Sequence, residues 1–303
     1  MNRRHFFVTI LAGAGNLLLG RSLLATRPLK SLSTDPFQRV PLGKTGLKVT
    51  LIGAGTGAKG GNRQSNLTRL GKQRCEALLR YAFDKGIRFF DCADLYGTHS
   101  YLANAFKSIP REQLVLSTKI WVRRGGLPEK ERPDANIVID RFRKELNTDY
   151  IDLVLIHCMT DPNWCDQQKR QMDIMANLKA KGIIRAHGVS IHSLAALKAC
   201  VDSAWVDSVH VRVNAYGDHM DDQNPAVVVP IIKRLHKAGK GVVGMKLIGE
   251  GNFRNDPEKI NQSLKYVLDL NSVNTLIVGF EKPEEIDDYA KRVQNILSAR
   301  VAG

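Results

Sequence analysis

Cysteine is scarce in this sequence, and no two cysteines are spaced as C-x-x-C. The five that are present form an odd count among 303 residues, so a disulfide framework is not expected and the fold must rest on a hydrophobic core. His157, Cys158 and Cys165 come nearest to a metal-ligand cluster, but their spacing fits no standard zinc pattern. The sequence therefore predicts no metal site.

Acidic residues are outnumbered, with 30 Asp and Glu against 45 Lys and Arg, which gives a net charge of +15. The basic residues are spread along the chain, and no basic block is interleaved with aromatic residues. We therefore expect no nucleic-acid partner, because such a partner is usually bound by a clustered basic face. The charge is more typical of a solvated basic surface around an anionic ligand.

No apolar run reaches the roughly 20 residues of a membrane span. The first apolar stretch covers residues 6–20, is broken by Asn16, and directly follows Arg3, Arg4 and His5. A charged start before a short apolar segment is typical of an export signal, and the paired arginines resemble a twin-arginine signal. We expect residues 1–36 to be a leader and linker of a periplasmic or exported protein, which meets the membrane only through the signal or the export machinery. The alternative is a cytoplasmic protein with an ordinary amphipathic leader or a retained anchor.

Strand and helix patterns alternate from residue 37 onward. A hairpin is expected over residues 40–49, and amphipathic helices separate the strands that follow it. The eight expected strands cover residues 49–53, 87–91, 113–119, 151–157, 185–190, 206–214, 241–247 and 273–279.

Eight such units in about 250 residues predict a (β/α)8 TIM barrel, an α/β fold, preceded by an N-terminal β-hairpin. We expect it to form a single domain over residues 37–303. A doubly wound sheet is the structural alternative. It would need a G-x-G-x-x-G turn after the first strand, and the glycine-rich residues 53–57 have different spacing.

Three consecutive expected strands end in an ionisable residue: Asp91, Lys119 and His157. Tyr96 follows Asp91 by five residues, in the loop above the same strand. Because chemistry in such barrels sits at the carboxyl ends of the strands, these four side chains are expected to meet at the mouth. Each also has an ordinary structural alternative, as a loop cap, a solvated strand end, a satisfied buried histidine or a packing aromatic.

Together the four residue types suggest proton donation to a carbonyl oxygen. Tyrosine is a weak acid, and a nearby ammonium such as that of Lys119 stabilises its phenolate and is expected to lower its pKa. Asp91 would hold the ammonium in place, and His157 would orient the carbonyl by a hydrogen bond. No side chain supplies a hydride, so a nicotinamide cofactor is implied.

The chain resembles the aldo-keto reductase family in four motifs, which cover residues 39–49, 89–97, 116–119 and 152–157. This resemblance implies the barrel fold, reduction of a small-molecule carbonyl substrate with NADP (NAD being possible), and a catalytic set of Asp91, Tyr96, Lys119 and His157.

The same resemblance indicates where the cofactor would bind, mostly at strand ends and in the loops that follow them. The expected cofactor-binding residues are Gly55, Thr56, Asp91, Ser190, His210, Met245, Lys246, Leu247, Gly249, Gly251, Gly279 and Lys282.

The sequence also departs from the family pattern. Ile191 stands where an asparagine would bind the nicotinamide amide, and His210 stands where a glutamine is expected. In the last cofactor loop Glu281 would repel a 2′-phosphate and Lys282 would attract it, so the preference between NADP and NAD is left open.

The substrate side is less defined. Trp121 and the basic segment 122–124, which contains Arg123 and Arg124, either rim the pocket or lie exposed in a loop. The Gly-rich loop 57–70 is expected to act as a lid. Three functions fit the sequence: a carbonyl reductase, a nicotinamide-binding regulatory barrel with little turnover, and a lyase or isomerase that uses Lys119 as a Schiff base. The last is disfavoured by Asp91 and Tyr96.

Overall fold

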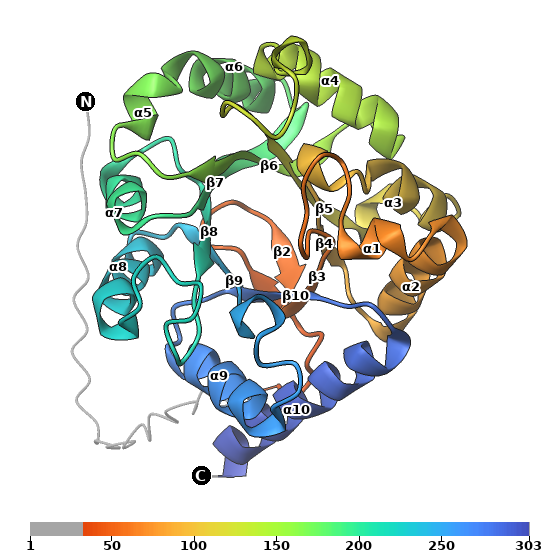
Figure 1. Ribbon diagram of the computed structural model, residues 1–303, viewed down its shortest axis with the longest axis vertical. Coiled ribbons are helices and arrows are strands. Elements are labelled where there is room, and N and C mark those ends of the chain that lie inside the picture. The colour runs from red at the N-terminus through yellow and green to blue at the C-terminus, as the bar shows by residue number, and fades with distance from the viewer. Residues whose placement is uncertain (1–32, 303) are drawn as a thin grey trace, which may run out of the picture. The chain divides into compact units, whose positions relative to one another are not determined.

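The computed structural model describes residues 33–302, which belong to one compact unit (Figure 1). The expected leader, apart from residues 33–36, lies outside these residues. No helix in this part of the chain is long and apolar enough to cross a membrane.

Eight parallel strands close into a barrel, in the order β10-β3-β4-β5-β6-β7-β8-β9 (Figure 1). The predicted (β/α)8 fold is therefore confirmed. The barrel strands are β3 (Ile52–Gly55), β4 (Phe89–Asp91), β5 (Val115–Ile120), β6 (Ile151–Met159), β7 (Ile184–Ile191), β8 (Ser208–Arg212), β9 (Gly241–Met245) and β10 (Thr275–Gly279).

Helices surround this ring of strands and cover its outer face (Figure 1). Their bounds are α1 (Asn66–Arg69), α2 (Lys72–Lys85), α3 (His99–Ala105), α4 (Ala135–Leu146), α5 (Trp164–Gln167), α6 (Lys169–Ala180), α7 (Leu194–Asp202), α8 (Pro225–Lys237), α9 (Pro257–Asp269) and α10 (Pro283–Ala302). Short 3-10 turns are η1 (Asp94–Tyr96), η2 (Arg111–Gln113), η3 (Glu129–Glu131) and η4 (Gly249–Gly251).

The helix ends follow from local sequence. Asp256 caps α9 by accepting a hydrogen bond from the backbone N–H of Lys259, and Pro257 occupies the first turn, where no N–H is needed. Gly86 ends α2 with φ of 120°, a conformation that residues with a Cβ rarely adopt. Both features were expected from the sequence.

The predicted hairpin consists of β1 (Arg39–Pro41) and β2 (Lys48–Thr50), paired antiparallel. Its fully buried Leu42 packs with Val49, and with Phe89, Val115 and Leu153 inside the barrel. The hairpin thus fills the end of the barrel opposite the carboxyl ends of the strands, which leaves only that carboxyl end open for chemistry.

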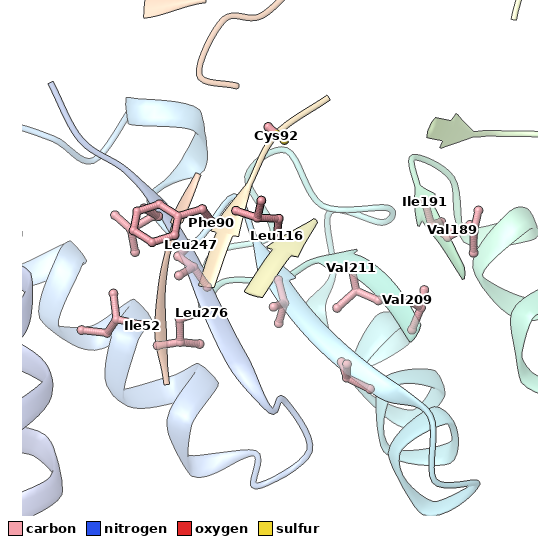
Figure 2. Packing of buried hydrophobic residues seen from close by; sticks show 14 of the residues in the cluster. Ile52, Phe90, Cys92, Leu116, Val189, Ile191, Val209, Val211, Leu247 and Leu276 are labelled. Atoms are coloured by element: carbon pink, nitrogen blue, oxygen red, sulfur yellow. The ribbon is translucent and has the colours of Figure 1, made fainter. Parts of the chain in front are cut away.

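Side chains of each barrel strand alternate between two cores. Phe89 points into the barrel, whereas its neighbour Phe90 packs outward under the helices with Leu116 and Leu276 (Figure 2). This period of two aims Asp91 inward again, two residues after Phe89.

Some strand bounds differ from the prediction. The run predicted over residues 49–53 is divided at Leu51, because the hydroxyl of Thr50 donates to the carbonyl of Ile52 (2.7 Å) and bends the chain between β2 and β3. The strand predicted to reach residue 247 ends at Met245, since Lys246 takes a left-handed φ of 60°.

Candidate active site

The four predicted catalytic side chains meet at the carboxyl end of the barrel, as the sequence predicted. Asp91 ends β4, Lys119 and His157 lie near the ends of β5 and β6, and Tyr96 lies in η1 just after β4. The Lys119 ammonium donates to Asp91 Oδ2 at 2.6 Å and to the carbonyl of Cys92 at 2.9 Å. The Tyr96 hydroxyl lies 3.2 Å from His157 Nε2.

Lys119 and Asp91 form an ion pair that is almost completely buried. Burial works against both charges, but the ammonium of Lys119 and the imidazole of His210 hold the pKa of Asp91 well below its usual range. Burial would lower the pKa of Lys119, yet Asp91 keeps it raised above the ordinary value. Both groups are therefore charged at neutral pH.

His210 donates from Nε2 to Asp91 Oδ1 at 3.0 Å, from the opposite side of the barrel. Burial lowers its pKa, so the imidazole is neutral despite the neighbouring carboxylate. Each carboxylate oxygen thus has its own donor, Lys119 for one and His210 for the other. His210 was expected to bind the cofactor, and in the structure it contacts Asp91.

The Tyr96 hydroxyl stays protonated in this arrangement. Burial raises the pKa of Tyr96 to about 12, although the nearby Lys119 charge acts in the opposite direction. The expectation of a lowered pKa was wrong because desolvation outweighs an ammonium that is already committed to Asp91. The nitrogen of Lys119 lies 5.0 Å from the centre of the Tyr96 ring.

His157 is a neutral hydrogen-bonding group. Burial, reinforced by the charge of Lys119, lowers its pKa well below the ordinary value. Its Nδ1 is buried without a partner, and a bare lone pair there costs less than an unpaired N–H. We infer that Nε2 carries the proton and can donate it in a hydrogen bond to an oxygen at the mouth.

A groove leaves Tyr96 and Asp91 and runs across the ends of β3, β9 and β10, with a cavity of about 260 Å³. Seven of the predicted cofactor-binding residues line it: Gly55, Asp91, Met245, Lys246, Leu247, Gly251 and Gly279.

The other five predicted positions are not among the residues that line the groove. Their places are these: Thr56 bonds to the carbonyl of Asp91, Ser190 accepts from the Cys158 N–H, His210 bonds to Asp91, Gly249 is buried in η4, and Lys282 is exposed.

The outer end of the groove contains an acid that sequence analysis had weighed only as repulsive. Glu281 accepts from the side chain of Asn66 at 2.6 Å and from Arg254 at 3.2 Å. Nearby, Lys246 pairs with Glu250 at 2.6 Å. Asn66 and Arg254 were not predicted, because nothing in their local sequence marks them as neighbours of a loop that follows the last strand.

The loop predicted to be a lid lies against Tyr96. A Cβ at Gly57 would come within 2.3 Å of the Tyr96 ring, so only glycine allows this approach. The loop is tied to the barrel by an ion pair from Arg63 to Asp94 (3.0 Å). It therefore forms one wall of the groove.

Trp121 lies beside His157 on the other side of the mouth, with ring centres 5.3 Å apart in an edge-on contact. Of the two alternatives weighed for this residue, the structure supports a position at the rim. Arg123, two residues later, contacts the carbonyl of Cys158 at 3.2 Å.

The (β/α)8 barrel, with a buried Lys–Asp pair and a Tyr–His pair at its mouth, is typical of one class of barrel oxidoreductases. Residues 51–263 match the Aldo/keto reductase family, so the chain belongs to that family.

Two sequence relatives show how far the likeness extends. The NADH-specific methylglyoxal reductase of Escherichia coli (strain K12) is 30% identical over 192 residues, which cover 58% of this chain and 54% of that protein. Probable aldo-keto reductase 1 of Glycine max is 25% identical, covering 72% of this chain and 61% of that protein. The match thus spans between about half and two thirds of these relatives.

Solved structures share the fold. A putative aldo-keto reductase from Pseudomonas aeruginosa has a TM-score of 0.68 and 24% identity, covering 91% of this chain and all of that one. An aldo/keto reductase from Klebsiella pneumoniae, solved in complex with NADP and acetate, has a TM-score of 0.60 and 19% identity, covering 84% and 90%.

The buried ion pair generates a stability prediction. Asp91→Asn leaves the Lys119 ammonium without its partner, and we expect a loss of about 3–5 kcal/mol in the free energy of unfolding. Urea denaturation at pH 7 measures it. Asp84→Asn, at an exposed pair with Arg80, is the control and should cost at most about 1 kcal/mol.

The loss of folding stability caused by Asp91→Asn should depend on pH in a defined direction. Because the folded-state pKa of Asp91 is depressed, its stabilisation is complete above the unfolded value of about 4 and is lost as the pH falls toward the folded value. The difference between wild type and Asp91→Asn should therefore shrink between pH 6 and pH 3. A difference that stays constant over this range contradicts a charged pair.

Proposed function

We propose that this chain is an NAD(P)H-dependent oxidoreductase that reduces small aldehydes or ketones to alcohols. The observation that carries the proposal is the contact of the Tyr96 hydroxyl with His157, beside the Lys119–Asp91 pair, at the inner end of a long groove. A proton donor and a carbonyl-orienting donor thus share one site.

The groove fits a dinucleotide. Gly251 lines the groove with its backbone alone. A Cβ built at this position would have no atom within 4 Å, so the backbone there faces open space. Apolar Met245 and Leu247 line its inner part, and Lys246 and Arg254 supply positive charge. We propose that Lys246 and Arg254 hold the phosphate groups of the cofactor, because cations favour phosphate oxygens.

A bound reduced nicotinamide supplies a hydride, two electrons with one hydrogen nucleus, to the carbonyl carbon. Tyr96 gives its phenolic proton to the carbonyl oxygen, so that the C=O bond becomes a C–O single bond in an alcohol. Its raised pKa keeps the proton in place until negative charge develops on that oxygen.

The neighbouring residues support this proton transfer. The ammonium of Lys119 stabilises the phenolate that Tyr96 leaves behind, and Asp91 fixes the ammonium. His157 donates from Nε2 to the same carbonyl oxygen and orients it. Solvent then returns a proton to Tyr96, so each turnover consumes one proton.

Tyr96→Phe removes the proton donor and little else. We expect kcat for carbonyl reduction to fall by about 10²–10⁴. Cofactor affinity should stay unchanged, because phenylalanine keeps the ring that lines the groove and the other groove residues are intact. Steady-state kinetics and a fluorescence titration of the cofactor measure the two effects. Near wild-type turnover of several aldehydes by the variant would refute the role of Tyr96. A wild-type protein that binds the cofactor but reduces no carbonyl would be the regulatory barrel instead.

We propose that the choice between NADPH and NADH depends on Glu281. Its carboxylate would repel a 2′-phosphate, whereas Arg254, which it contacts, would attract one. The exposed Lys282, to which the sequence had assigned the attraction, does not line the groove. Since the two opposite charges are paired, we expect weak discrimination between the two cofactors.

Glu281→Arg should shift the preference toward NADPH by at least about tenfold, or roughly 1.4 kcal/mol. Titration of both cofactors by fluorescence, against wild type and variant, measures the ratio of dissociation constants. Lys282→Gln is the control and should leave this ratio unchanged. A wild type that already binds NADPH far more tightly, and does not respond to Glu281→Arg, would place the 2′-phosphate elsewhere.

We also propose that residues 1–36 are a leader and linker with a twin-arginine-type export signal, and that residues 37–303 are the catalytic domain. The support is the arginine pair Arg3-Arg4 before a short apolar stretch. Replacing both with Lys (Arg3→Lys, Arg4→Lys) should keep a tagged protein in the cytoplasm without changing its unfolding transition. Unchanged fractionation would favour the alternative, a cytoplasmic enzyme.

A further inference from the structure

The loop after β5 brings two arginines together beside the mouth of the barrel. Arg132 donates from Nη1 to the carbonyl of Arg123 at 2.8 Å, and Arg123 donates to both the carbonyl and the thiol sulfur of Cys158, at 3.2 and 3.0 Å. Cys158 directly follows His157. The guanidinium of Arg123 is therefore anchored one residue away from the imidazole that orients the carbonyl.

Neither arginine has an acidic partner in residues 33–302. The acidic neighbour of Arg132 in sequence, Glu131, pairs instead with Arg63. The Nε of Arg132 is also buried without a hydrogen-bond partner. An unpaired buried donor on a charged group is costly, and a guanidinium without an acidic partner leaves its charge free to attract an anion.

The backbone at this position is built for the contact. The pairing of β6 with β7 is irregular between Ile156 and Met159, and Cys158 takes a left-handed φ of 62°. Such irregularities at the rim of a barrel re-aim the chain next to a site. Here the irregularity directs the Cys158 carbonyl and thiol to Arg123.

Positive charge also gathers across the mouth. Burial, together with the charges of Arg212, Lys246 and Arg123, lowers the pKa of His192 to about 3. Of these, Arg212 is paired with Asp221 and Lys246 with Glu250. Arg123 remains available for an incoming anion.

We propose that the substrate is a small aldehyde or ketone that carries an anionic group, a carboxylate or a phosphate, and that Arg123, braced by Arg132, binds this group. The planar guanidinium fork matches the oxygens of both kinds of anion. This inference rests on the proposed carbonyl reduction and specifies its substrate class.

The test compares carbonyl substrates with and without an anionic group. Values of kcat/KM are measured for 4-oxobutanoate and its methyl ester, and for glyceraldehyde 3-phosphate and glyceraldehyde, with the full chain and saturating NADPH or NADH. We expect the wild type to prefer at least one anionic member by about tenfold or more. Which pair shows the preference identifies the anion.

Variants then locate the site. Arg123→Gln should reduce the anionic-to-neutral ratio by about tenfold, and Arg123→Lys should retain part of it, because the charge survives without the fork. Arg124→Gln removes the same charge from the neighbouring exposed position and should change the ratio less than about threefold. Equal kcat/KM for both members of each pair, or equal effects of Arg123→Gln and Arg124→Gln, would overturn the inference while leaving carbonyl reduction in place.

A binding measurement separates failure of the inference from failure of the proposed function. Succinate cannot be reduced in this way, and its binding is followed by calorimetry with wild type and Arg123→Gln. If no carbonyl is reduced but succinate or inorganic phosphate binds in an Arg123-dependent manner, the anion site stands and the reductase assignment falls. If neither anion binds and no anionic carbonyl is preferred, the anion site is refuted.

Discussion

The ion pair between Lys119 and Asp91 is the interaction on which the mouth of this barrel depends. A charge buried to this degree is tolerated only when it is paired and its remaining hydrogen-bonding capacity is filled. The barrel meets that requirement from three strands: β4 supplies the carboxylate, β5 the ammonium and β8 the imidazole of His210. Lys119 then stands fixed beside Tyr96. Because the hairpin plug fills the opposite end of the barrel, these charges are reached only from the carboxyl ends of the strands.

Much of this architecture can be predicted from the sequence, because the signals for it are local. The alternation of strands and helices can be recognised from the period of two within strands, from glycine at helix ends and from the Asp-Pro pair that begins α9. The barrel follows from the number of strands. The placement of Asp91, Lys119 and His157 was equally predictable, since each lies at the end of an apolar run. For these residues, position along a strand is sufficient to give position in space.

The contacts that were missed are those that depend on the closure of the barrel. His210 meets Asp91 across 119 residues of sequence, and Glu281 meets Asn66 across 215. No periodicity predicts such a contact. His210 and Asp91 lie on strands at opposite sides of the ring, and Glu281 and Asn66 follow β10 and β3, whose pairing closes the ring. The pKa of Tyr96 was misjudged for a related reason. The sequence suggests a nearby ammonium, but only the folded site shows that the ammonium is already committed to Asp91 and that burial dominates.

These charges divide the mouth into regions with different electrostatic character. On the groove side, Lys246 and Arg254 are each balanced by an acid, Glu250 and Glu281. On the side of Trp121, Arg123 lacks such a partner among the described residues. Paired cations discriminate weakly between ligands of different charge, because the acid beside each one cancels much of its field. An unpaired cation retains its field, which is only partly screened near a low-dielectric wall. Arg123 should therefore select for ligand charge more strongly than the paired Lys246 and Arg254 do.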